Sequence, residues 1–118
     1  MRDFHNLTIW IRSHQLTLKI YNLTKSFPKE ETFGLVSQMR RAVYSIPSNI
    51  AEGCGRNSNP DFKRFLTISV GSSSELEYQL FLSHDLGFIP VTLFKELETE
   101  TIRLRKMIYA LIKKLDEC

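Results

Sequence analysis

Apolar residues recur along this chain at intervals of three and four, the spacing that places them on one side of an α-helix. The first such segment runs from Leu7 to Thr24, and Phe27-Pro28 ends it because proline cannot continue a helix. Its apolar stripe consists of Ile9, Leu16, Ile20 and Leu23. The chain is therefore predicted to begin with one amphipathic helix.

A second helix is predicted from Pro28 to about Gly53, with Glu30 and Glu31 near its positive N-terminal end. Its apolar stripe continues past Pro47, which predicts one kinked helix rather than two. Glycines in the segment Gly53-Cys54-Gly55 are expected to end the helix in the left-handed conformation. The members of this stripe are Val36, Met39, Val43, Ile46 and Ile50.

Two further helices complete the pattern. Asn59 is expected to be the N-cap of the third helix, with Pro60 at its first position. This helix is predicted to end near Leu86, capped by Gly87, and the fourth begins after Pro90. The stripe of the fourth helix consists of Leu97, Leu104, Ile108, Leu111 and Leu115. Four long helices with short connections predict an all-α, antiparallel up-and-down four-helix bundle, with residues 1–118 as a single domain.

Composition adds constraints on partners and location. The 118 residues carry a net charge of +3, which mildly favours polyanionic partners. Cys54 and Cys118 are too few for a disulfide framework or a four-cysteine metal site. The N-terminus lacks the apolar core of a signal peptide, and no apolar run approaches the roughly 20 residues that span a bilayer. We therefore expect a cytoplasmic protein without membrane contact.

Sequence motifs for catalysis are missing. The chain has no Walker loop, no H-E-x-x-H and no G-x-S-x-G. His5, His14 and His84 lack ligand partners at helical spacing, and Ser72-Ser73-Ser74 lacks a neighbouring base. The small serines are better explained by helix packing. We therefore predict no catalytic residues, no metal site, no cofactor and no enzymatic activity.

The basic residues of the fourth helix allow two interpretations. Acids lie near its start and bases near its end, which complements the helix dipole. Alternatively, the bases opposite the apolar stripe form a phosphate-binding strip, repeated in each subunit of an oligomer. The residues of this candidate nucleic-acid-binding strip are Arg103, Lys106, Lys113 and Lys114.

The second and third helices each carry a second face away from the core. Gly71, Tyr78 and Leu82 share one such face of the third helix and are poor choices for a free surface. A mid-helix glycine costs about 1 kcal/mol relative to alanine, which suggests close backbone approach. We expect these faces to contact another subunit, with Arg41 and Arg64 pairing there with Glu52 or Glu75. The alternative is a solvated face with ordinary ion pairs.

The segment from Ser37 to Gly53, SQMRRAVYSIPSNIAEG, closely resembles the signature of the four-helix-bundle proteins encoded in intervening sequences of bacterial large-subunit ribosomal RNA genes. The match continues through Gly55-Arg56, Asp61-Phe62, Arg64-Phe65-Leu66, Gly71-Ser72 and Glu75-Leu76-Glu77. The resemblance implies a homopentameric barrel of four-helix bundles without known enzymatic activity. The related accessory variability determinant proteins of diversity-generating retroelements are similar in fold, and they bind nucleic acid and a reverse transcriptase.

Carried onto this chain, the resemblance assigns a set of residues to shaping the bundle and its subunit contacts: Arg41, Ser48, Asn49, Glu52, Gly53, Arg56, Gly71 and Glu75. Our leading hypothesis is a non-enzymatic homo-oligomer that binds RNA or DNA phosphates through its basic surface. The alternative is a scaffold for another protein, such as a reverse transcriptase, without a direct nucleic-acid role.

Overall fold

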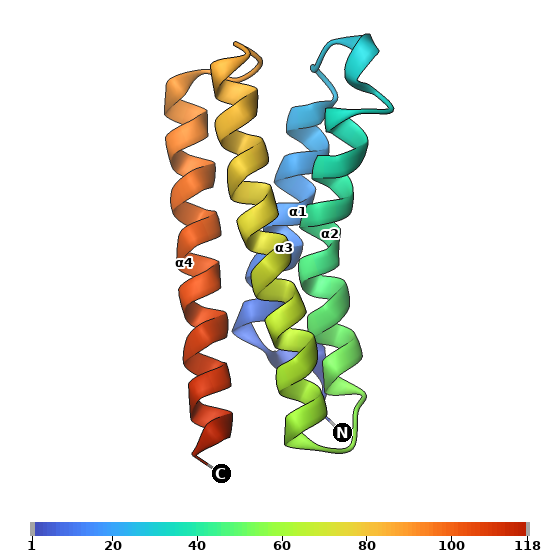
Figure 1. Ribbon diagram of the computed structural model, residues 1–118, viewed down its shortest axis with the longest axis vertical. Coiled ribbons are helices and arrows are strands. Elements are labelled where there is room, and N and C mark those ends of the chain that lie inside the picture. Colours follow the sequence, from blue (N-terminus) through green and yellow to red (C-terminus); the bar gives the residue numbers. More distant parts are fainter. Residues whose placement is uncertain (1, 118) are drawn as a thin grey trace.

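The computed structural model describes residues 2–117 and shows four long helices running side by side (Figure 1). The helices are α1 (Thr8–Thr24), α2 (Leu35–Cys54), α3 (Asn59–Asp85) and α4 (Val91–Asp116), with short 3₁₀ helices at Phe4–Asn6 and Lys29–Glu31. The described chain contains no strand and measures 46 × 23 × 20 Å. Successive helices run in opposite directions, so both ends of the chain lie at one end of the bundle. The predicted all-α four-helix architecture is confirmed.

The helices form a closed square in cross-section. Each packs against its neighbour in sequence, and α1 also packs against α4. The backbones of α1 and α3 do not approach each other closely, so these two occupy diagonal corners and their outer faces point in different directions.

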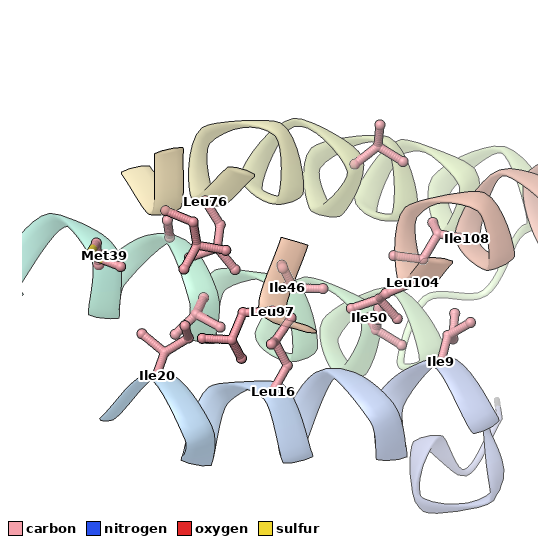
Figure 2. Packing of buried hydrophobic residues seen from close by; sticks show 14 of the residues in the cluster. Ile9, Leu16, Ile20, Met39, Ile46, Ile50, Leu76, Leu97, Leu104 and Ile108 are labelled. Atoms are coloured by element: carbon pink, nitrogen blue, oxygen red, sulfur yellow. The ribbon is translucent and has the colours of Figure 1, made fainter. Parts of the chain in front are cut away.

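The core is built from the predicted stripes (Figure 2). Residues from all four helices meet along the bundle axis, and the labelled ones are Ile9, Leu16, Ile20, Met39, Ile46, Ile50, Leu76, Leu97, Leu104 and Ile108. All ten are at most 6% exposed. Leu23 and Leu111 belong to the predicted stripes but are only partly buried at the edge of the core. The spacing of apolar residues therefore identified the inward faces of α1, α2 and α4 correctly.

The predicted start of α2 is wrong. Pro28 is followed by the 3₁₀ turn Lys29–Glu31, and α2 begins only at Leu35. The helix cannot continue through Gly34, whose backbone angles (φ −110°, ψ −108°) are not helical. The Glu31 carboxylate accepts a hydrogen bond from the Leu35 backbone N–H at 3.2 Å. An acid does lie at the N-terminus of α2, but it belongs to the preceding turn.

Helix α2 runs through Pro47 as a single helix, as predicted. Because proline has no N–H, the Val43 carbonyl loses its usual partner four residues later. The buried Thr17 hydroxyl of α1 lies 3.3 Å from this carbonyl oxygen and 2.7 Å from that of Ser13, and can donate its proton to either. A neighbouring helix therefore brings a hydroxyl donor within reach of the carbonyl that the proline leaves without its usual partner.

The turn between α2 and α3 differs from the prediction in two ways. Gly55 has a right-handed conformation (φ −81°, ψ −4°), so no left-handed glycine ends α2. The N-cap of α3 is Ser58, whose hydroxyl accepts a hydrogen bond from the Asp61 N–H, and Asn59 is already the first helical residue. The Asn59 side chain instead accepts a hydrogen bond from the Arg2 guanidinium at 2.8 Å. A contact distant in sequence thus decides the role of Asn59.

Gly53 is buried inside α2, where α3 approaches closely. A Cβ atom at this position would lie 2.8 Å from Cδ1 of Phe62 and 3.0 Å from Cβ of Phe65. Further along the same interface, the buried Ser69 donates a hydrogen bond to the Ile46 carbonyl at 3.0 Å. Small residues therefore allow α2 and α3 to pack tightly. Of the serines for which helix packing was predicted, Ser72 takes part, since its hydroxyl lies 2.8 Å from that of Ser45 on α2.

The predicted end of α3 at Gly87 is confirmed. Gly87 has φ +79°, the left-handed conformation that favours glycine. Its N–H donates to the His84 carbonyl, and the Phe88 N–H donates to the Ser83 carbonyl, each at 2.9 Å. This pair of bonds is a Schellman motif, which satisfies carbonyls at the end of α3.

Candidate nucleic-acid interface

The outer face of α4 carries exposed basic residues along its second half. Leu104, Ile108 and Leu115 point into the core, so the positions opposite them face solvent. Arg103, Lys106, Lys113 and Lys114 are all exposed there. Within residues 2–117, Arg103, Lys106 and Lys113 have no acidic side chain within 4 Å. Cations without local partners remain available to an external anion.

Arg105 lies between these residues in sequence but not in space. It points towards α3, where its guanidinium donates to Glu77 at 2.6 Å and to Ser74 at 3.3 Å. Its charge is therefore neutralised within the chain. The remaining bases, Arg103, Lys106, Lys113 and Lys114, are called the α4 strip below.

Arg12 of α1 extends the positive surface beyond α4, and sequence reasoning missed it. Arg12 and Arg103 both line a cleft between α1 and α4. Because α1 and α4 are antiparallel neighbours, residues near the start of α1 lie level with residues late in α4. The sequence did contain an indication of this basic surface, because Arg12 and Lys19 are seven residues apart and therefore share one face of α1.

The ion pairs of the α2–α3 side form within one chain. Arg41 of α2 pairs with Glu75 of α3 at 3.2 Å, Glu52 pairs with Arg56 at 2.9 Å, and Arg64 lies 3.8 Å from Asp61. These groups are largely exposed, so each pair contributes at most about 1 kcal/mol to stability. Pairing with another subunit stays a prediction.

The other residues assigned to shaping the bundle occupy different environments. Asn49 makes a local hydrogen bond by donating to the Ser45 carbonyl at 2.8 Å. Ser48 is exposed on α2. The Arg56 guanidinium lies 4.7 Å from the centre of the Phe65 ring, within the range of a cation–π contact.

Gly71 lies on the exposed face of α3, and a Cβ atom added there would meet no heavy atom within 4 Å. Gly71 therefore serves no close packing within its own bundle, and the predicted close backbone approach at Gly71 would have to involve another molecule. Ile68 and Tyr78 flank it, and Tyr78 is 63% exposed.

The described residues hold no metal-ligand cluster, and their one thiol is buried. Between residues 2 and 117, no three His, Cys, Asp or Glu side chains gather in a way that could hold a metal ion. The Cys54 thiol is buried, and this burial raises its pKa, which disfavours the reactive thiolate. In the same part of the chain, no helix is both long and apolar enough to cross a bilayer.

The fold is that of an all-α protein of the antiparallel four-helix-bundle class. The family model of the 23S rRNA-intervening sequence protein matches residues 5–110. The chain belongs to this family, as the signature around Pro47 indicated.

A solved structure supports the same assignment. It is described as a protein of unknown function from the S23 ribosomal protein family of Bacteroides thetaiotaomicron. The two folds agree with a TM-score of 0.84 and 26% sequence identity, over 90% of this chain and 99% of that chain. None of the curated proteins compared matches this sequence.

Proposed function

We propose that this protein is a non-enzymatic homo-oligomer that binds RNA or DNA through the phosphate groups of the backbone. The observation that carries this proposal is the α4 strip, where Arg103, Lys106 and Lys113 are exposed without an acidic partner among the described residues. Dipole complementarity alone places bases near a helix end, but it does not require them to share one outward face. A line of cations on one face suits a polyanion.

The exterior of the bundle favours phosphate contacts over base reading. Helix α4 lies along the bundle, with its inner side packed into the core, and its strip consists of arginine and lysine. Sequence-specific recognition needs side chains that reach base edges in a groove, whereas phosphate contacts only position the partner. We therefore expect binding with little sequence preference and strong dependence on salt.

Self-association is supported by two separate apolar surfaces. Ile68 and Tyr78 flank Gly71 on α3, while Ile11 and Leu18 are exposed on α1, Leu18 by 57%. Because α1 and α3 are diagonal, one surface of a bundle can meet the other surface of the next copy. Contacts between unlike surfaces generate rings when the rotation closes. This geometry suits the homopentamer that the family resemblance implies, and it repeats the α4 strip around the assembly.

Nucleic-acid binding is tested by measuring affinity for a structured RNA and for a DNA duplex across a salt series. We expect log affinity to fall linearly with log salt, with a slope of about 0.9 per phosphate contacted on duplex DNA. Replacing Lys106 and Lys113 with glutamine should weaken binding and reduce this slope. The matched control replaces Lys25 and Lys29, which are exposed at the opposite end of the bundle.

Equal losses in the two double variants would place the binding site outside the α4 strip. No binding by the wild-type protein at low salt would overturn the nucleic-acid proposal. The exposed apolar surfaces would then favour the alternative, a scaffold that binds another protein.

Self-association is tested by light scattering after size-exclusion chromatography. We expect a mass several times that of the 13.8 kDa chain for the wild type and a smaller mass for Gly71→Leu. Thr99→Leu, at an exposed position on α4, is the matched control and should leave the mass unchanged. A monomeric wild type would contradict the oligomer, and an unchanged mass for Gly71→Leu would place the interface elsewhere.

A further inference from the structure

The cleft between α1 and α4 has a volume of about 110 Å³. Leu16 and Leu104, each only 2% exposed, form its apolar floor. Arg12, Gln15 and Arg103 contribute to its polar lining. By the same measure of volume one water needs about 10–15 Å³, so the cleft has room for a group of several water volumes, such as a phosphate.

The two acids near this cleft share one lysine. Lys19 donates a hydrogen bond to Glu100 at 2.5 Å and lies 3.8 Å from Glu96. The hydrogen bond to Glu100 raises the pKa of Lys19, so this ammonium stays charged at neutral pH. Lys19 (+1) with Glu96 and Glu100 (−1 each) carries a net charge of −1, so the two arginines (+2) leave the cleft and its surroundings with a net charge of +1.

Arg12 and Arg103 have no counter-ion of their own. Within residues 2–117, neither guanidinium lies within 4 Å of a carboxylate. Two cations that line the same small cleft repel each other, and an anion held between them removes that repulsion. Guanidinium groups match tetrahedral oxyanions well because their donors form a planar fork.

We propose that this cleft binds one phosphate group of a nucleic-acid backbone, held between Arg12 and Arg103 with the Gln15 amide as a neutral donor. The inference deepens the proposed function and rests on it for the source of the phosphate. Continuity favours this source, because Arg103 also begins the α4 strip and Lys106 follows it about 4.5 Å further along the helix axis. A backbone anchored in the cleft can place later phosphates along the strip.

The first test measures RNA affinity for Arg12→Gln, Arg103→Gln and the double variant, with Lys25→Gln, directly after the end of α1, as the control. Each single substitution should weaken binding about five- to tenfold at low salt, and the control by less than twofold. If both arginines hold the same phosphate, the loss in the double variant is smaller than the product of the single losses. Arg12→Lys should restore only part of the affinity, because lysine keeps the charge but not the fork.

The results separate this inference from the proposed function. Binding by the wild type together with equal losses for Arg12→Gln and Lys25→Gln overturns the cleft site and leaves the proposed function standing. Losses that multiply in the double variant overturn the shared phosphate. Since Arg12 and Arg103 are exposed, these variants should fold, which circular dichroism checks.

A second measurement uses inorganic phosphate and follows the side-chain Nε–Hε signals of the arginines by NMR. Saturable shifts of Arg12 and Arg103, without shifts of Arg64, support the cleft as a phosphate site. If the wild type binds no nucleic acid, such shifts keep the phosphate site but overturn its assignment to a nucleic-acid backbone. Absence of shifts for both phosphate and RNA overturns the inference altogether.

Discussion

Gly53→Ala tests whether α2 and α3 are packed to their limit. The new Cβ atom would lie 2.8 Å from Cδ1 of Phe62 and 3.0 Å from Cβ of Phe65. Phe62 is fully buried and Phe65 is 6% exposed, so neither ring can move into solvent. One of the two helices must therefore shift, or a side chain must leave its preferred rotamer.

The size of the effect follows from two opposing contributions. Overpacking a well-packed core costs about 1–3 kcal/mol, while alanine gains up to about 1 kcal/mol over glycine within a helix. Gly53 is the last residue but one of α2, so that gain is smaller than at a central position. We expect a net loss of about 1–2 kcal/mol in the free energy of unfolding. For 118 residues this lowers Tm by about 4–8 °C.

The assay is thermal and urea denaturation followed by circular dichroism, at one protein concentration because self-association would make Tm concentration-dependent. Gly55→Ala is the matched control, since its Cβ would come no closer than 3.4 Å to another atom, the Glu52 carbonyl oxygen. Its stability should stay the same or rise by up to about 1 kcal/mol. Combining Gly53→Ala with Phe62→Leu should cost less than the sum of the single losses. If Gly53→Ala is as stable as Gly55→Ala, the argument from close packing is refuted.

Three further predictions concern local contacts. Ser58→Ala should lower the free energy of unfolding, measured by urea denaturation, by about 1 kcal/mol because it removes the N-cap of α3. A larger loss for Asn59→Ala would contradict the assignment of Ser58 as the N-cap. Thr17→Val should cost about 1–2 kcal/mol because it removes a buried hydroxyl that lies 2.7 Å from the Ser13 carbonyl oxygen and 3.3 Å from that of Val43. An unchanged urea midpoint would show that this hydroxyl is dispensable. Cys54 should resist alkylation in the folded protein, because its side chain is 1% exposed and burial raises its pKa. It should react once urea unfolds the chain, and peptide mapping by mass spectrometry measures both reactions.

The ends of helices show where sequence reasoning was reliable. Gly87 was predicted correctly because a left-handed glycine closes its helix through bonds within the same short segment. Asn59 was assigned wrongly as an N-cap because two suitable capping residues, Ser58 and Asn59, are adjacent in the chain. Arg2, brought next to Asn59 by the fold, engages its side chain. Local signals alone could not choose between the two.

In the candidate interface, too, spacing along the chain predicted some features and the packing of helices decided others. The helical spacing of α4 correctly placed Arg103, Lys106, Lys113 and Lys114 on its exposed face. It could not show that Arg105 is neutralised by Glu77, because that contact depends on how α3 and α4 pack.

The sequence by itself determined the four helices, the inward faces of α1, α2 and α4 and the membership of this family, since these depend on spacing along the chain and on a contiguous signature. Only the tertiary structure decided that Gly53 serves a close contact, that Thr17 lies beside the carbonyl freed by Pro47, and that Arg12 and Arg103 share a cleft. Each of these features joins residues of two helices. Their meeting depends on the rotation and register of packed helices, which arise from the whole core and not from any one segment.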